Sequence, residues 1–395
     1  MNRIAFFVQH MLCGGVENSL IALSKVLYRE GYEVTIYMIS KTGEFIDRIP
    51  DGVVYKSIPL PKSIERILPV GGTKLTVKKN LKEHHYIRAA INLKNHIFGK
   101  SKFAELNVNF DSIPILNEEY DIAVNFHMHS PFLVRYLSEK VQANRKLTWI
   151  HNDFYTTKYD IKALKGYLEC CEGFYAVSKK LKDEFISILP EYKEKTDIIY
   201  NIVPIDEIIE RANEEDTPEY NNVSENNLIF LSVGRLEYQK GYDLAVRVCK
   251  KLVEKELKFK WFILGDGSER RKIEKEIENQ ELQNTMFILG IKMNPYPYFK
   301  NCDIYIQTSR HEGYVTTVTE AKVFNRPIIC TDVSGAREQI EDGVTGFVVD
   351  FNIDEIVEKI YLLSKDNSLR NSFIKNTLSR NEVGEIKDCI KPFLN

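Results

Sequence analysis

The chain has 395 residues, of which 44% are hydrophobic and 28% charged, and its formal net charge is −2. This composition is typical of a soluble globular protein, and the length suits two domains of about 200 residues each. A net charge so close to zero provides no global field that would recruit nucleic acid. We therefore expect no nucleic-acid partner.

The seven cysteines indicate a reducing, cytoplasmic environment. Their number is odd and no two form a Cys-x-x-Cys pair, which argues against a disulfide framework and against a zinc site. They are Cys13, Cys170, Cys171, Cys249, Cys302, Cys330 and Cys389.

The first half of the chain alternates predicted strands and helices. Residues 4–8 form a five-residue apolar run, which predicts a first β-strand rather than a signal peptide or a membrane span. A helix from Gly14 to Glu30 and a strand at 33–39 complete a βαβ start with a glycine loop at its first crossover. Further strands are expected at 122–126, 146–150, 173–177 and 197–200.

The glycine pair Gly14-Gly15 allows two interpretations. It makes a tight strand-to-helix turn, or it lets the backbone approach a substrate closely at a helix start. The pair alone does not decide between them.

Residues 61–102 form a basic segment with ten Lys or Arg against two Glu, a local balance of +8. Apolar residues are interleaved with the charges. Such a mixture could lie on an anionic bilayer or could be a solvated helical face, and both interpretations stay open. The basic residues are Lys62, Arg66, Lys74, Lys78, Lys79, Lys82, Arg88, Lys94, Lys100 and Lys102.

Polar side chains follow two of the predicted strands. His127 and His129 come after the strand at 122–126, and His151 and Asp153 come after the next strand. All four are expected at the carboxyl ends of strands. No third ligand has zinc spacing with the histidines, so we expect no metal site.

The first domain is expected to end near residue 203. The polar run 213–227 leads into a second domain, predicted over 204–375, and a terminal segment, 376–395, follows it.

The second half opens with a candidate diphosphate clamp. A strand leads into a loop that carries Arg235 and Lys240, and a guanidinium and an ammonium at a strand end suit two adjacent phosphates. Two later strands stop at Gly265 and Gly290, where a flat base could lie against bare backbone.

Glu312 and Glu320 stand eight positions apart across a turn and the start of a helix predicted at 315–324. We expect the backbone N–H groups of Tyr314, Val315 and Thr316 to be unpaired at a positive helix terminus, where an anion binds readily. Glu320 can accept hydrogen bonds from two vicinal hydroxyls.

These motifs occur in an order that resembles the retaining glycosyltransferases of family 4. The resemblance rests on Gly234-Arg235, Lys240-Gly241, Gly265-Asp266-Gly267, Gly290, Glu312-Gly313, Glu320-Ala321 and 342–347. It implies an α/β fold of the GT-B type, with two facing Rossmann-like domains and the cleft between them. The terminal segment would then cross back to the first domain.

The resemblance also implies roles for individual residues. Arg235 and Lys240 would hold the diphosphate, Glu320 the ribose, and Glu312 the donor sugar. Donors to the phosphates would come from Gly313, Tyr314, Val315, Thr316 and Thr317. In the first domain, Gly14 and Gly15 would face the donor, His129 or else His127 would touch the donor sugar, and His151 and Asp153 would face the acceptor.

The expected activity is transfer of a sugar from a nucleoside diphosphate sugar, with UDP favoured, to a hydroxyl of a saccharide or lipid-linked acceptor. The resemblance implies neither a metal nor a cofactor. It favours bacterial cell-surface polysaccharide or glycolipid synthesis at the inner face of the membrane. Two alternatives remain, a non-catalytic sugar-nucleotide-binding partner subunit and a phosphorylase with the same architecture.

Overall fold

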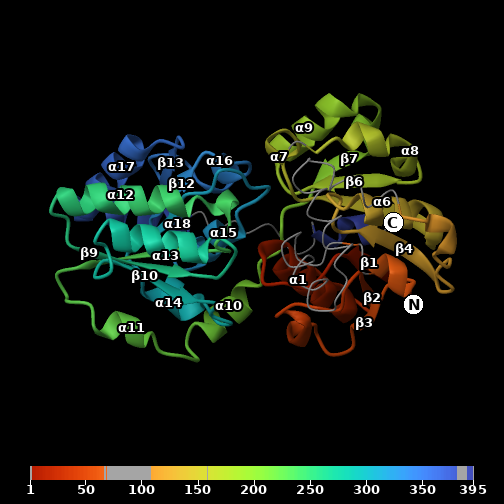
Figure 1. The fold of residues 1–395 in the computed structure, drawn as a ribbon, viewed down its shortest axis with the longest axis horizontal. Coiled ribbons are helices and arrows are strands. Elements are labelled where there is room, and N and C mark those ends of the chain that lie inside the picture. The colour runs from red at the N-terminus through yellow and green to blue at the C-terminus, as the bar shows by residue number, and fades with distance from the viewer. Residues whose placement is uncertain (1, 66–67, 69–107, 158, 380–388, 395) are drawn as a thin grey trace. The chain divides into compact units, whose positions relative to one another are not determined.

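The computed structural model describes residues 2–65, 68, 108–157, 159–379 and 389–394 (Figure 1). The chain divides into two compact units, 1–202 with 386–395, and 203–385. Most of the basic segment 61–102 lies outside the described residues.

The first unit is built on a seven-stranded parallel sheet in the order β3-β2-β1-β4-β5-β6-β7. Its register pairs Ile4 with Val34 on one side and with Ile122 on the other. The strands are β1 (Arg3–Val8), β2 (Glu33–Met38), β3 (Val54–Ser57), β4 (Glu119–Asn125), β5 (Gln142–Ile150), β6 (Gly173–Ala176) and β7 (Thr196–Ile198).

Serine hydroxyls cap two helices of the first unit. Ser130 Oγ accepts the N–H of Leu133 at 3.4 Å, and Ser178 Oγ accepts that of Leu181 at 3.3 Å, each satisfying a donor that the first turn leaves unpaired. The helices are α1 (Gly15–Arg29), α2 (Lys62–Glu65), α6 (Pro131–Lys140), α7 (Phe154–Thr157), α8 (Lys165–Leu168) and α9 (Lys179–Ile188).

The end of the chain packs on this unit. The carbonyl of Pro392 accepts a hydrogen bond from Arg145 Nη1 at 3.1 Å, and that of Phe393 accepts one from the Tyr32 hydroxyl at 2.9 Å. Asn376, by contrast, donates to Val344 O of the second unit at 3.0 Å. Within the described tail, residues 389–394 therefore lie with the first unit, while 376–379 lie with the second.

The second unit contains a six-stranded parallel sheet in the order β10-β9-β8-β11-β12-β13. The strands are β8 (Leu228–Val233), β9 (Phe259–Leu264), β10 (Met286–Gly290), β11 (Ile304–Gln307), β12 (Ile328–Thr331) and β13 (Gly346–Val349). The helices are α10 (Ile205–Arg211), α11 (Pro218–Asn221), α12 (Tyr242–Glu254), α13 (Arg270–Asn279), α14 (Tyr296–Asn301), α15 (Thr316–Val323), α16 (Ala336–Gln339), α17 (Ile353–Lys365) and α18 (Asn367–Ser379). The second unit also has the short 3-10 helix η6 (Tyr238–Lys240). The 3-10 helices of the first unit are η1 (Ile46–Arg48), η3 (Phe110–Ser112), η4 (Ile161–Leu164), η5 (Pro190–Lys195) and η7 (Lys391–Phe393).

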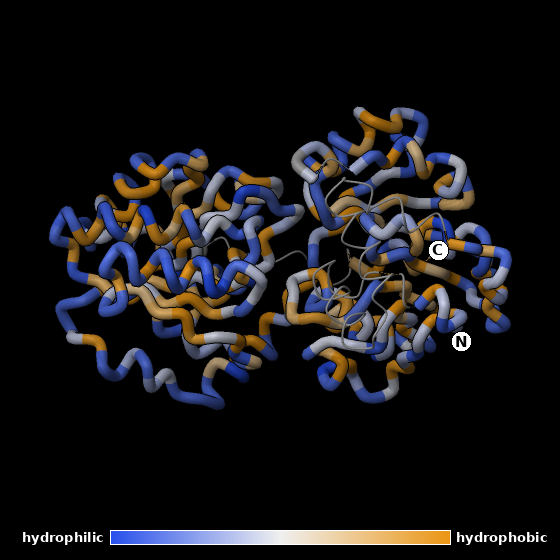
Figure 2. The backbone as a smooth tube through the Cα atoms, viewed as in Figure 1, coloured by the Kyte–Doolittle hydropathy of each residue, from blue (hydrophilic) through white to orange (hydrophobic). Residues whose placement is uncertain are grey.

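Both faces of the second sheet are buried. Successive residues of a strand alternate between two cores, so Phe230 packs with α12 and α17 while Leu231 packs with α14 and α15. Figure 2 shows the apolar strands inside and the polar helix surfaces outside. This explains why the strands read as continuous apolar runs, as parallel strands covered on both faces do.

The predicted fold class is confirmed, with two parallel Rossmann-like sheets. The sequence analysis missed β3, whose four residues are all exposed and give no alternation of apolar and polar positions. It also left β12 and β13 unassigned. Among the described helices, none combines the length and the apolar character that a membrane crossing needs.

Each sheet has one point at which the strand order reverses. In the first unit β2 and β4 flank β1, and in the second β9 and β11 flank β8. The loops that leave the carboxyl ends of the two strands at such a point diverge, and the opening between them is where ligands of open α/β sheets bind. The candidate sites are therefore the loops after β1 and β4, and those after β8 and β11.

Gly241 shows how tightly the second of these openings is built. Its φ is +66°, and a Cβ atom there would lie 2.0 Å from the Thr308 carbonyl oxygen. Gly343 has a similar φ of +74° but no atom within 4 Å of its would-be Cβ.

We expect Gly241→Ala to lower the melting temperature more than Gly343→Ala. Both carry the left-handed penalty of about 1–2 kcal/mol, and only the first adds a backbone clash. Differential scanning fluorimetry of the two variants checks this. Equal shifts would show that Thr308 moves aside at no cost.

Candidate functional site

The loop after β8 is fixed against the loop after β9 by close backbone contact. A Cβ at Gly265 would lie 2.0 Å from the Gly234 carbonyl oxygen, and one at Gly267 would lie 2.5 Å from that of Leu236. Leu236 N–H also donates to Asp266 O at 2.9 Å. Gly265, which was predicted as a base-binding position, therefore also has a structural role that it shares with Gly267, which is to let the two loops touch.

Lys240 and Glu312 form an ion pair. Lys240 Nζ lies 2.6 Å from Glu312 Oε1, and their side chains are 15% and 9% exposed. Ser309 Oγ donates to the same oxygen at 2.6 Å. The lysine and the glutamate, predicted to contact different parts of the donor, thus neutralise each other.

Glu312 is held by a chain of buried polar groups that starts in β11. Tyr305 hydroxyl donates to Gln307 Oε1 at 2.5 Å, and Gln307 Nε2 donates to Ser309 Oγ at 2.6 Å. Ser309 in turn holds Glu312. The sequence analysis did not predict this chain of hydrogen bonds. The available signal was a glutamine, Gln307, at the end of a buried strand.

Arg310 fastens the loop after β8 to the loop after β11. Its guanidinium donates two bonds of 2.7 Å to Asp243 and one of 2.7 Å to Tyr238 O, and it lies 3.9 Å from the centre of the Tyr238 ring. The guanidinium holds the pKa of Asp243 below its usual range. Such bidentate pairing fixes geometry as well as charge. The sequence analysis did not identify this pair.

Arg235 differs from Lys240 because it is exposed. Its guanidinium has no ion pair or hydrogen bond within the described ranges. Of the two predicted clamp residues, Arg235 is thus the one whose charge is open to a ligand.

One expectation about the start of α15 needs correction. Thr316 N–H donates to Tyr314 O at 3.1 Å, because the chain makes a tight local turn there, so the prediction that it is unpaired is wrong. Val315 is 1% exposed and belongs to the core. Three further residues of this segment were predicted to bind the donor. Gly313 is buried and Glu320 is 6% exposed. Thr317 is placed near the end of β11, with its Oγ1 3.4 Å from Gln307 Oε1.

In the first unit, Gly14 caps the start of α1 with extended backbone, followed by Gly15. A Cβ at Gly14 would lie 2.5 Å from Glu17 Oε2. Glu17 is 7% exposed, and its Oε1 lies 3.3 Å from His10 Nδ1 and 3.8 Å from His127 Nε2. The sequence analysis missed Glu17 and His10. An acidic residue in the first turn after a glycine pair was the available signal.

His127 and His129 lie in different surroundings. His127 Nδ1 accepts the N–H of Gln9 at 3.1 Å, which assigns the ring proton to Nε2, on the side of Glu17. His129 packs its ring 4.4 Å from that of Tyr159 and 5.2 Å from that of Phe154. The structure thus brings His127 to the loop after β1, and His129 to α7.

His151 is a buried imidazole whose ring lies 4.6 Å from that of Phe126. Burial, helped by the nearby His127, lowers the pKa of His151 to about 3, so the ring is neutral at physiological pH. Neither of its ring nitrogens has a hydrogen-bond partner among the residues that the structure describes.

Asp153 lies beside a second carboxyl group, that of Glu184 on α9. Glu184 Oε2 accepts the N–H of Phe154 at 3.2 Å. Burial and the negative charge of Asp153 raise the pKa of Glu184 to about 7. The candidate acceptor residue is therefore one member of a buried carboxyl pair.

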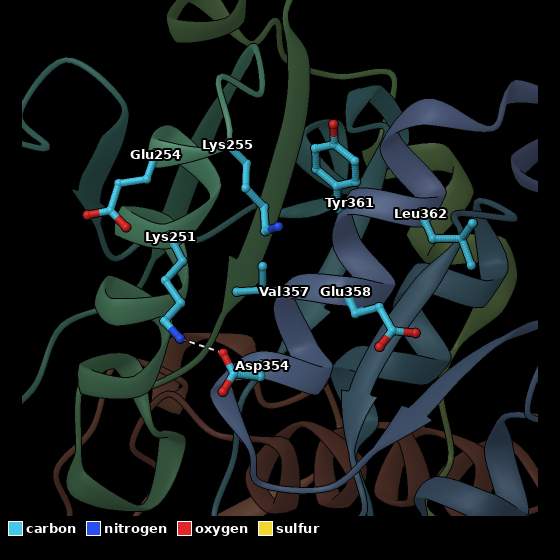
Figure 3. A pocket seen from close by; sticks show the side chains of 8 residues that line it. All are labelled: Lys251, Glu254, Lys255, Asp354, Val357, Glu358, Tyr361 and Leu362. Carbon is cyan, nitrogen blue, oxygen red and sulfur yellow. Dashed lines mark hydrogen bonds and ion pairs between the residues drawn. The ribbon is translucent and has the colours of Figure 1, made fainter.

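A hollow of about 690 Å³ lies between α12 and α17 (Figure 3). Lys251 points across it to Asp354, with which it is paired, and Val357 and Tyr361 also line it. None of the candidate residues lines this hollow.

In the parts of the chain that are described, no group of three or more His, Cys, Asp or Glu is arranged to hold a metal ion.

The comparisons with known proteins agree with this geometry. Residues 213–380 match the model of the glycosyl transferases group 1 family. An uncharacterised glycosyltransferase of Methanocaldococcus jannaschii is 31% identical over 208 residues, which cover 50% of this chain and 51% of the relative. The N-acetylgalactosamine-N,N'-diacetylbacillosaminyl-diphospho-undecaprenol 4-alpha-N-acetylgalactosaminyltransferase of Campylobacter jejuni is 27% identical over 207 residues, which cover 51% of this chain and 54% of the relative. The matches thus span about half the length of these relatives.

Among solved structures, Anabaena HepE in complex with UDP and glucose superposes with a TM-score of 0.71 at 17% identity, covering 97% of this chain and 95% of that one. Staphylococcus aureus TarM, in a complex that contains UDP, gives 0.69 at 15% identity and covers 100% and 99%. At these identities the likeness shows the fold, which is the GT-B fold of glycosyltransferases. The family match lies in the second unit, where residues 213–380 correspond to the glycosyl transferases group 1 family.

The Lys240–Glu312 pair generates a stability prediction. We expect Lys240→Met to destabilise the protein by about 3–5 kcal/mol, because it leaves a buried carboxylate without its cation. The double variant Lys240→Met/Glu312→Gln should recover most of this loss. Urea unfolding of the wild type, both single variants and the double variant gives the coupling energy between the two side chains. If the changes in unfolding free energy of the single variants simply added up in the double variant, the two side chains would not stabilise each other.

The Asp153–Glu184 pair predicts a pH dependence. Because the pKa of Glu184 is raised in the folded protein, the folded state binds more protons than the unfolded state between the ordinary glutamate pKa of 4.5 and about 7. Stability from this group is present at the acidic end of that window and is lost as the pH rises through it. Glu184→Gln should therefore raise the melting temperature relative to wild type more at pH values above the window than below it.

Asp183→Asn is the matched control, because Asp183 is the exposed neighbour of Glu184 on the same helix. Thermal unfolding at both ends of the window compares the two variants. The same pH response in both variants would contradict the raised pKa of Glu184.

Proposed function

We propose that the protein is a retaining glycosyltransferase that moves a sugar from a nucleoside diphosphate sugar to an acceptor hydroxyl. The observation that carries this is the convergence of Arg235, Lys240 and Glu312 at the point where the strand order of the second sheet reverses. The family match supports the same class of reaction.

A UDP-sugar is the favoured donor. Two of the superposed relatives were crystallised with UDP, and the exposed guanidinium of Arg235 suits its diphosphate. Lys240 is already held in place by Glu312, so its ammonium needs little reorganisation to stabilise the charge that develops on the departing diphosphate. Glu312 would contact the donor sugar, and Glu320 the ribose.

The first unit would supply the acceptor side. Its candidate residues are His129, His127, His151 and Asp153, with Gly14 and Gly15 in the loop after β1. The Campylobacter jejuni relative is named for a lipid-linked acceptor. We propose a cell-surface saccharide or lipid-linked saccharide for this chain too, handled at the cytoplasmic face of the membrane. Contact of the basic segment with anionic lipid remains a prediction from sequence.

Two alternatives are less well supported. A non-catalytic sugar-nucleotide-binding subunit has no need of the clamp, yet Arg235, Lys240, Glu312 and Glu320 are all present. A phosphorylase of this architecture would hold pyridoxal phosphate on a lysine. An absorbance scan of the purified protein for bound pyridoxal separates this case.

A binding experiment tests the donor assignment. We expect UDP to stabilise the wild type, and Arg235→Ala to weaken UDP binding about tenfold or more, as loss of a charge-assisted hydrogen bond does. Calorimetric titration with UDP measures both, with and without EDTA, and binding should survive the chelator.

Arg271→Ala is the matched control, since Arg271 is an exposed arginine of the same unit outside the candidate site. If Arg235→Ala bound UDP as tightly as the control, the clamp would be misassigned. A strict requirement for a divalent metal would count against a clamp made of side chains and backbone N–H groups.

A further inference from the structure

The two carboxylate oxygens of Glu312 have unequal surroundings. Oε1 accepts from Lys240 Nζ at 2.6 Å and from Ser309 Oγ at 2.6 Å, so both of its lone pairs are used. Oε2 has a single contact in the described part of the chain, with Gln239 Nε2 at 3.4 Å. That amide makes its shorter bond, of 2.9 Å, to the His311 carbonyl oxygen. Oε2 is therefore the oxygen that keeps acceptor capacity for a ligand.

The carboxylate also fixes the direction of every hydrogen bond behind it. As the partner of the Lys240 ammonium, Glu312 can only accept, so the Ser309 hydroxyl donates to it. Ser309 Oγ then accepts from Gln307 Nε2 at 2.6 Å, which leaves Gln307 Oε1 to accept from the Tyr305 hydroxyl at 2.5 Å. A reversed Gln307 amide would take the proton that Ser309 gives to Glu312. The chain of hydrogen bonds thus has one arrangement.

This chain of hydrogen bonds is buried and anchored in the second sheet. Tyr305 and Ser309 are 0% exposed and Gln307 is 3% exposed. Tyr305 and Gln307 belong to β11, and Thr331 Oγ1 of the neighbouring β12 donates to the Ser309 carbonyl oxygen at 2.6 Å. A side chain held by such a buried support loses little freedom when a ligand binds. Glu312 is therefore preorganised by residues that no ligand needs to touch.

We propose that Ser309 and Gln307 are positioning residues for the donor sugar, which saturate Oε1 of Glu312 and leave Oε2 to accept a hydrogen bond from the sugar. The inference rests on the proposed function and deepens it by naming the group that is recognised. Because Oε2 can only accept, that group is a hydroxyl or an amide N–H of the sugar. UDP without a sugar lacks this group, so its affinity does not depend on the chain of hydrogen bonds.

The first test compares UDP with a UDP-sugar by calorimetric titration. The UDP-sugar is the one that the wild type hydrolyses fastest among UDP-glucose, UDP-galactose and their two N-acetylhexosamine counterparts. We expect Ser309→Ala to weaken its binding about tenfold, as the loss of a hydrogen bond to a charged group does, and to leave UDP affinity at the wild-type level. Gln307→Met keeps the Ser309 hydroxyl but frees it to rotate, and it should weaken UDP-sugar binding by a smaller factor.

Thr331→Val is the matched control. The Thr331 hydroxyl is buried in the same place, but its contacts are the backbone carbonyls of Ser309 and Gln307 and not their side chains. Ser309→Ala and the control both lose a buried hydrogen bond, so both should lower the melting temperature. Only Ser309→Ala should lower the ratio of UDP-sugar affinity to UDP affinity. An unchanged ratio in Ser309→Ala, or an equal fall in the control, would overturn the proposal.

The second test identifies the group on the sugar. Analogues of the same UDP-sugar each lack one hydroxyl or the amide group. One analogue should bind the wild type about tenfold more weakly than its parent, yet bind Ser309→Ala as tightly as the parent does, because that variant has already lost the contact. If the losses from Ser309→Ala and from the analogue added up for every analogue, the role of Glu312 Oε2 would be refuted.

Failure of this inference differs from failure of the proposed function. A wild type that binds a UDP-sugar, combined with a Ser309→Ala variant that keeps the wild-type ratio, refutes the positioning role alone. A wild type that binds no UDP-, GDP- or ADP-sugar refutes the proposed function, and the positioning role falls with it.

Discussion

The reversal of strand order in each parallel sheet is the constraint on which the rest of the structure depends. Because helices cover both faces of the second sheet, as its two cores show, polar side chains can gather only where strands end. The carboxyl ends beside β1 and β8 are the places where two loops diverge and leave backbone and side chains accessible. Glu17 in the first unit, and Lys240 and Glu312 in the second, lie at these two edges for that reason.

Charges near these edges are mostly compensated before any ligand arrives. Lys240 is paired with Glu312, and Arg310 with Asp243, because a buried ion without a partner would cost several kcal/mol. Arg235, in the loop after β8, has no such partner among the described residues, and it is exposed to solvent, where an unpaired charge costs little. The protein thus separates groups that hold the loops in place from a group that is open to an incoming anion.

The sequence predicted β8, β9 and β10 of the second unit because each is a local feature, an apolar run that leads to a glycine. A glycine after a strand, or a glutamate at a helix start, can be read from a few neighbouring residues. Pairs that are distant in the chain could not be read this way, such as Arg310 with Asp243, 67 positions apart, or Glu17 with His127. Thr316 shows that a local feature can also be predicted wrongly. Its backbone N–H was expected to be unpaired, but it donates a hydrogen bond to the Tyr314 carbonyl in a tight turn.

The two edges differ in charge, and this difference bears on which substrate each one suits. The second unit presents an exposed guanidinium beside a preorganised ammonium, a combination that attracts a diphosphate. Near the candidate residues of the first unit lie the carboxylate of Glu17 and the buried Asp153–Glu184 pair, which disfavour an anion close to them. An anionic leaving group and an uncharged nucleophile are the two participants in transfer from a sugar nucleotide. The electrostatics of the two units therefore support the proposal that the second unit binds the diphosphate and the first binds the acceptor hydroxyl.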